Sequence, residues 1–130
     1  MSADVPEPRL ADDEQQLFRR GVDEFNRGYF FECHDTLEEM WAGLRGQSRD
    51  FFQGLIQVSV AFYHLGNGNP PGAQSMLERA LKRFAKYPAR YFGFDLAAHR
   101  VELQGWLVRV AAGTAKPPPL EAVPKWRFEA

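Results

Sequence analysis

The sequence predicts an all-α fold, a single compact domain of about five helices packed as antiparallel hairpins. Apolar residues recur at three- and four-residue spacing in successive segments, as they do on the buried face of a helix. Glycine and proline stand between these segments, where they end one helix and start the next. A chain of 130 residues, 45% of them hydrophobic, is long enough to bury one hydrophobic core and too short for two.

The first two expected helices are joined by a short turn. The first begins near Asp12 or Asp13, either of which can cap its free amide groups, and it ends at Gly28. The second covers about residues 30–44. Its buried face combines apolar side chains with a histidine at the spacing of one helical stripe: Phe30, His34, Leu37, Trp41 and Leu44.

Three more helices are expected along the rest of the chain. The third, residues 49–65 with Ser48 as its cap, is apolar almost all round, so it is expected at the centre of the fold. The fourth starts after a cap at Asn69 and continues to about Tyr87, and the fifth runs from a cap at Asp95 to about residue 113. No segment has a convincing strand pattern.

Residues 11–113 form the predicted helical domain, and the segments on either side of it differ in character. Residues 1–10 are expected to be flexible, and they lack the basic start and apolar stretch of an export signal. Residues 114–130 are expected as an extended Pro-rich tail, because three consecutive prolines favour an extended backbone. Trp126 and Phe128 indicate that this tail packs on the domain, with a tail that binds a partner as the alternative.

The charge balance and the single cysteine exclude several classes of protein. The net charge is −1, with −6 in residues 1–47 and +5 in residues 48–130, which suits solvated faces and does not favour nucleic-acid binding. One cysteine rules out a disulfide framework and fits the reducing cytoplasm, where we expect the protein to act. The apolar run at 51–65 is too short to span a membrane, so no membrane association is expected.

Polar side chains on the second and third helices form the candidate site. His34 and Glu38 lie one turn apart on or beside the apolar stripe, and a carboxylate that faces the interior needs a specific partner. Gln53, Gln57 and His64 share one narrow stripe of the third helix. Because the connection between these helices is short, they should pack antiparallel and bring the two polar stripes together.

Three interpretations of this group stay open. In an acid/base enzyme, Glu38 is the base, with His34 and His64 as its partners. Gln57 then orients the substrate, and Trp41 forms a wall. In a metal centre, His34, Glu38 and His64 hold a divalent ion. In a structural network, the same polar groups bond to one another and fix the register of the helices.

Two other reactive side chains have a structural interpretation. Cys33 is adjacent to His34 in sequence, but neighbours on a helix point about 100° apart, so it fits a small core residue better than a nucleophile. His99, on the apolar side of the fifth helix, is expected to be a core histidine whose hydrogen bonds are satisfied.

The pattern around the candidate site resembles a known family. It is carried by YFFECHDTLEEMW at 29–41, GLIQ at 54–57, YH at 63–64 and GNPPGA at 68–73. These strings resemble the small all-helical family of bacteria and archaea catalogued as domain of unknown function 309, over about residues 17–87. The resemblance implies a multi-helical domain with no established activity. The stripes and the family pattern together indicate these ligand-binding candidates: Glu32, Asp35, Trp41, Gln53, Gln57, Tyr63 and Asn69.

A looser similarity to tetratricopeptide units, in Gly28-Tyr29 and in GNPPGA before a helix, adds a second class of function. The first class is a small-ligand domain or an enzyme, with a partly open pocket between the second and third helices. The second class is a non-catalytic interaction domain, which forms a homodimer or binds a protein partner through an apolar groove.

Overall fold

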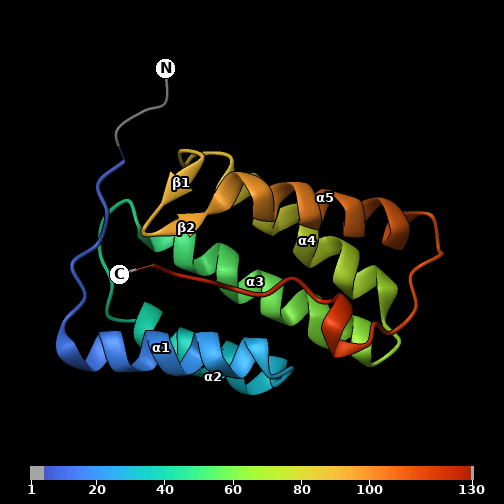
Figure 1. Cartoon of the computed structure of the whole chain (residues 1–130), viewed down its shortest axis with the longest axis horizontal. Helices are drawn as coiled ribbons and strands as arrows, with labels where there is room; N and C mark the ends of the chain where they lie inside the picture. Colours follow the sequence, from blue (N-terminus) through green and yellow to red (C-terminus); the bar gives the residue numbers. More distant parts are fainter. Residues whose placement is uncertain (1–4, 130) are drawn as a thin grey trace.

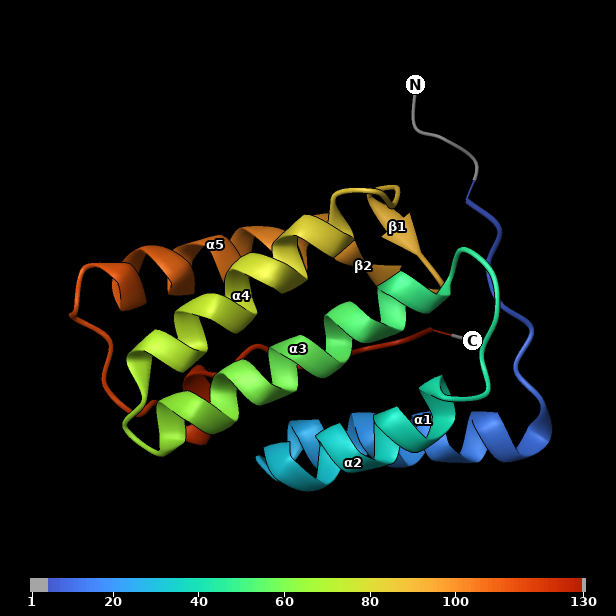
Figure 2. The ribbon, with the colours of Figure 1, turned by 180° about the vertical axis from the view of Figure 1, so that it is seen from behind.

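Successive helices lie against one another along the chain in the computed structural model, which describes residues 5–129. The helices are α1 (Asp12–Asn26), α2 (Phe30–Trp41), α3 (Arg49–Gly66), α4 (Pro70–Phe84) and α5 (Leu96–Ala111). Figure 1 shows α1 and α2 on one side of α3, with α4 and α5 on the other. Seen from behind in Figure 2, α2, α3 and α4 lie side by side on one face. The predicted all-α fold is confirmed.

Helix α3 is the centre of the core, as its uninterrupted apolar pattern predicts. Phe51, Phe52 and Leu55 are each 0% exposed. Helix α4 comes especially close at Gly54, where an added Cβ would lie 2.5 Å from Cε1 of Phe84. The contact between these two helices therefore depends on a glycine at this position. Within residues 5–129, no helix is long and apolar enough to cross a membrane.

The predicted caps of α4 and α5 are confirmed. The Asn69 side-chain oxygen accepts a hydrogen bond from the Gly72 N–H at 3.2 Å. The Asp95 side chain accepts one from the Ala98 N–H at 3.1 Å. Each bond satisfies an amide that has no partner inside its own helix.

The predicted caps of α1 and α3, and the end of α2, are wrong. Helix α1 already includes Asp12, so its cap position falls on Ala11, whose N–H donates to the Glu14 carboxylate at 2.8 Å. Ser48 has helical backbone angles and makes no capping bond with its side chain. Helix α2 stops at Trp41, one turn before the predicted end at Leu44.

A short hairpin precedes α5, where no strand was expected. Strands β1 (Arg90–Tyr91) and β2 (Phe94–Asp95) pair antiparallel. Phe92 and Gly93 form the turn between them, with φ values of 53° and 72°. Positive φ at both turn residues is the geometry of a two-residue hairpin loop. Strands of two residues are too short to produce an alternating pattern, so periodicity could not reveal them.

The segment after α5 contains a short turn, η1 (Leu120–Ala122), and then runs between α1 and α5 (Figure 1). Trp126 is 1% exposed, and its ring stacks on Phe25 with the centroids 3.8 Å apart. The Asn26 amide donates to the Trp126 carbonyl and accepts from the Trp126 N–H, both at 2.8 Å. These contacts attach the segment to α1.

The predicted flexible segment 1–10 extends beyond the described residues, and residues 5–10 contact the hairpin. The Tyr91 hydroxyl donates to the Pro6 carbonyl at 2.5 Å, and the Phe92 N–H donates to the Glu7 carboxylate at 2.9 Å. Part of the N-terminal segment is thus held against the β1–β2 turn.

Candidate functional site

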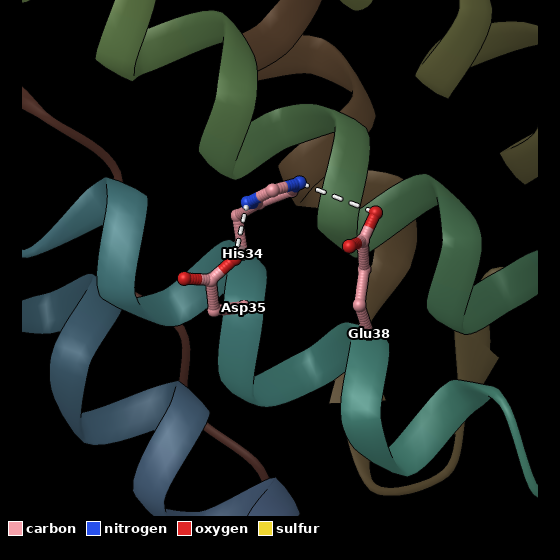
Figure 3. A group of neighbouring side chains, drawn as sticks. All are labelled: His34, Asp35 and Glu38. Atoms are coloured by element: carbon pink, nitrogen blue, oxygen red, sulfur yellow. Dashed lines mark ion pairs between the residues drawn. The ribbon is translucent and has the colours of Figure 1, made fainter.

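One turn of α2 brings an imidazole and two carboxylates together. Nδ1 of His34 lies 3.3 Å from the Asp35 carboxylate, and Nε2 lies 3.2 Å from that of Glu38. Figure 3 shows the imidazole between the two carboxylates, on the side of α2 that faces α3. The His34 side chain is 24% exposed, so it is partly shielded but open to a ligand.

This arrangement has two chemical consequences. A neutral imidazole donates through one nitrogen only, so the ring can donate to both carboxylates only when it is protonated. A bound cation could balance the two carboxylates in place of a protonated imidazole. The ligand atoms of His34, Asp35 and Glu38 all lie within 4.8 Å of one another, a spacing that a divalent ion could bridge.

The Glu38 side chain is 53% exposed, which corrects the expectation that it faces the interior. It stands at the rim of a cleft of about 220 Å³ between α2, α3 and α4. The predicted convergence of the two helices brings these polar residues to the cleft: His34, Glu38, Gln53 and Gln57, together with Arg79 of α4. A carboxylate at such a rim keeps part of its hydration and needs no fully buried partner.

Trp41 forms one wall of this cleft and is held firmly in place. Its indole N–H donates to the Arg49 carbonyl at 3.0 Å. The Arg49 guanidinium lies over the ring, 3.6 Å from the centroid. The wall is therefore a flat aromatic surface with its one polar atom already satisfied.

Gln57 is the unusual residue of the cleft. It is 8% exposed, and its Oε1 atom is buried without a hydrogen-bond partner in residues 5–129. Leaving a buried acceptor unpaired costs about 1–3 kcal/mol. A group that enters the cleft and donates a hydrogen bond to this oxygen would recover that cost.

A second cavity continues the cleft along α4. It measures about 380 Å³ and shares Gln53, Gln57 and Arg79 with the first. Its other lining residues are basic: Lys82 and Arg83 of α4, and Lys86 just after the end of that helix. The charge distribution predicted only solvated faces. The signal for this wall is the spacing of the basic residues, because Arg79, Lys82 and Arg83 lie on one side of α4 and Lys86 follows at the same interval.

His64 does not join the group formed by His34, Asp35 and Glu38. Its Nδ1 lies 3.1 Å from the Asn69 side-chain nitrogen, which can donate to it. It lines a separate apolar cavity of about 120 Å³ that also touches Phe31, His34 and Tyr63. The structure therefore places Asp35, and not His64, beside the other two predicted metal ligands.

Several other candidates lie outside the cleft. Glu32 is exposed on α2, and Tyr63 is 39% exposed, with its ring 5.4 Å from that of Phe31. Cys33 is 0% exposed, and burial raises the pKa of its thiol to about 12. This agrees with the expected core role, because a thiol with that pKa is not a nucleophile at neutral pH.

His99 is buried as expected, but its hydrogen bonds are not satisfied. It is 2% exposed, and neither ring nitrogen has a hydrogen-bond partner in the described part of the chain. Aromatic rings surround it, with Phe94 at 5.1 Å and Phe84 at 6.2 Å between centroids. The phenyl rings carry no acceptor, and the Glu102 carboxylate lies 3.8 Å from Nδ1, beyond hydrogen-bond distance, so the expectation of a satisfied histidine is wrong.

Comparison with known proteins gives a match to a family of unassigned activity over the segment that contains much of the cleft. The family described as Domain of unknown function (DUF309) matches residues 18–76, which include all of α2 and α3. The resemblance inferred from the sequence is confirmed. The match ends before the basic residues of α4 that line the second cavity.

Two curated relatives are themselves uncharacterised. An uncharacterized protein of Aquifex aeolicus (strain VF5) is 28% identical over 92 residues, which cover 70% of this chain and 28% of that protein. The uncharacterized protein YpuF of Bacillus subtilis (strain 168) is 35% identical over 54 residues, covering 41% of this chain and 31% of YpuF. The chain thus spans less than a third of the length of either relative.

Proposed function

Starting from a family match that carries no assigned activity, we propose that this helical domain binds a small ligand in the cleft between α2 and α3. The supporting observation is the buried Gln57 oxygen, which has no donor in a cleft that His34 and Glu38 also line. A purely structural network would pair its buried polar atoms with one another. An unpaired acceptor on a residue that lines a cleft can bond to a ligand that enters the cleft.

Each wall of the cleft has a distinct task in this proposal. Trp41 provides a flat apolar surface for an unsaturated or hydrocarbon part of the ligand. Gln57 accepts a hydrogen bond at the floor. His34, held by Asp35 and Glu38, donates or accepts at the rim according to its protonation.

The test compares two amides in the same protein. Gln57→Leu removes an unpaired acceptor, so its unfolding free energy should equal or exceed that of the wild type. Asn26→Leu is the matched control, because both polar atoms of Asn26 are bonded to Trp126, and this variant should lose about 2 kcal/mol. Urea denaturation measures both. A loss for Gln57→Leu as large as that for Asn26→Leu would assign Gln57 to a structural network and contradict the proposal.

A metal-dependent or acid/base enzyme is the second candidate, supported by the close grouping of His34, Asp35 and Glu38. Calorimetric titration with Zn²⁺ and Mn²⁺ tests it. One ion should bind per chain, and His34→Gln or Glu38→Gln should each remove that binding. Glu39→Gln is the control, since Glu39 is an exposed neighbour outside the group. Absence of binding, or binding that His34→Gln leaves unchanged, would exclude a metal centre here.

A further inference from the structure

The second cavity has an unusual concentration of positive charge. Arg79, Lys82, Arg83 and Lys86 line its α4 wall, and Gln53 and Gln57 line its α3 wall. No acidic side chain lines it within residues 5–129. Arg79, Lys82 and Arg83 are spaced at i, i+3 and i+4 on α4 and so face the same way, and Lys86 lines the same cavity just beyond the helix, so the four like charges repel one another.

The protein neutralises only part of this charge. Asp50, at the start of α3, accepts from Arg83 at 2.6 Å and also pairs with Lys86. Arg79 and Lys82 have no carboxylate within 4.0 Å in the described part of the chain. Within residues 5–129 four cations therefore share one carboxylate, which leaves about three positive charges for an anionic ligand to neutralise.

Two buried atoms in the walls of this cavity, one hydrogen-bond donor and one acceptor, have no partner among residues 5–129. In that part of the chain, Nε of Arg83 is a buried donor without an acceptor, and Oε1 of Gln57 is a buried acceptor without a donor. The first calls for an anionic oxygen and the second for a hydroxyl or amino hydrogen. Gln57 lines both cavities, so one ligand can meet both requirements.

We propose that this cavity binds the phosphate of a hydroxyl-bearing phosphomonoester, with the phosphate against Arg79, Lys82 and Arg83 and a hydroxyl donating to Gln57. The proposal rests on the proposed ligand-binding function of the adjoining cleft, and it names the class of ligand. A phosphomonoester carries a charge of about −1.5 to −2 at neutral pH, which neutralises more than half of the uncompensated positive charge. Arginine also binds phosphate through two parallel N–H donors.

The shape of the site favours a small ligand over nucleic acid. The basic residues line a concavity that continues into the 220 Å³ cleft beside Trp41. The combined size falls in the range of pockets that enclose small organic molecules. Nucleic acid instead requires a long basic surface with exposed aromatic residues for stacking.

A pair of matched ligands separates the contributions of charge and hydroxyl. Glycerol 3-phosphate and methyl phosphate carry the same phosphate, but only the first has hydroxyl groups. Calorimetry on the wild type should show both binding, with glycerol 3-phosphate about three- to tenfold tighter. Gln57→Leu should remove that preference and retain phosphate binding. Arg79→Gln and Lys82→Gln should each weaken both ligands about tenfold.

A control variant and a competing ligand show which results would overturn the phosphate proposal. Arg27→Gln removes a positive charge from an exposed pair on α1 and should leave both affinities unchanged. The proposal is overturned if neither phosphate binds, or if Arg79→Gln binds as well as the wild type. It is also overturned if a short single-stranded RNA binds more tightly and displaces glycerol 3-phosphate. Failure of the phosphates alone leaves the ligand cleft standing, whereas a destabilised Gln57→Leu variant counts against the cleft itself.

Discussion

Residues with the same functional group differ in whether their surroundings provide hydrogen-bond or ion-pair partners. Asn26 and Gln57 carry the same amide, but both polar atoms of Asn26 are bonded and the Gln57 oxygen is unpaired. Arg27 and Arg79 carry the same guanidinium, yet Arg27 pairs with Asp23 at 3.2 Å and Arg79 faces a cavity. A group with unmet bonding capacity that also lines a cavity, as Gln57 and Arg79 do, is the kind that a ligand can use.

Cys33 should be inert in the folded protein. Burial raises the pKa of its thiol to about 12, so almost none of it is thiolate at neutral pH. Iodoacetamide at about pH 8 should leave the native protein unmodified over a period that labels the denatured chain fully. Mass spectrometry reads the result. Equal labelling of the native and denatured forms would mean that the α2 face opens readily.

Asp50 should make stability fall in acid. The hydrogen bond from Lys86 is the largest cause that holds the pKa of Asp50 below its ordinary value, with Arg83 adding to it. Because the folded-state pKa is the lower one, the stabilisation is present above the unfolded value of about 3.9. It is lost as pH falls through the folded value.

Asp50→Asn should therefore lower the unfolding free energy at neutral pH by up to about 1 kcal/mol. The difference from the wild type should be smaller at about pH 2 than at neutral pH, because the stabilisation from Asp50 is lost as the pH falls through its lowered folded-state pKa. Urea denaturation at the two pH values measures this. The exposed pair of Asp23 and Arg27 provides the control, since Asp23→Asn should change little. A difference that stays constant with pH would contradict the assigned role.

On the scale of helices, glycine determines how closely two elements can approach. An added Cβ at Gly54 would meet the Phe84 ring, which is 0% exposed and cannot move away without disturbing the core. Gly105, in the middle of α5, has open space in the same direction. The same substitution at these two positions should therefore have opposite effects.

Gly54→Ala should lose about 1–2 kcal/mol, because overpacking against Phe84 exceeds the gain in helix propensity. Gly105→Ala should gain up to about 1 kcal/mol from propensity alone. Thermal unfolding of both variants measures the contrast. Two changes of the same sign would show that contact with Phe84 does not limit the approach of α3 and α4.

The helices could be predicted from the sequence because the signals for a helix lie within a few residues of one another. Apolar spacing located all five, and the Asn69 and Asp95 side chains identified two caps, because each bond joins residues three apart. The β1–β2 hairpin escaped because two-residue strands have no period. Antiparallel packing of α2 and α3 predicted that His34, Glu38 and Gln57 would line one cleft. Arg79 lies on α4, and residue spacing within α4 does not show how that helix is placed against the other two.

At the scale of the whole molecule, the segment after α5 completes the core. Trp126 stacks on Phe25, and the neighbouring Phe128 stacks on Phe94 with the centroids 4.4 Å apart. Both rings of the first pair are 1% exposed or less. The segment therefore joins α1 to the hairpin that precedes α5.

Trp126→Ala should destabilise the entire domain by about 3–5 kcal/mol, because it leaves a large cavity beside Phe25. Unfolding followed by fluorescence of the remaining tryptophans and by circular dichroism should give one coincident transition. Arg127→Ala, an exposed neighbour, should change stability by less than about 0.5 kcal/mol. Separate transitions for the two signals would mean that the segment unfolds independently of the helices.

The bond between Asn26 and Trp126 also joins residues that are 100 positions apart in the chain. A ribosome adding about 5–20 residues each second leaves α1 waiting roughly 5 to 20 s for the tryptophan that covers Phe25. During that interval Phe30 and Phe62 can already pack against Phe25, but the ring face that Trp126 covers in the folded protein has no partner. The stacking that completes the core is thus also the step that covers this face during synthesis.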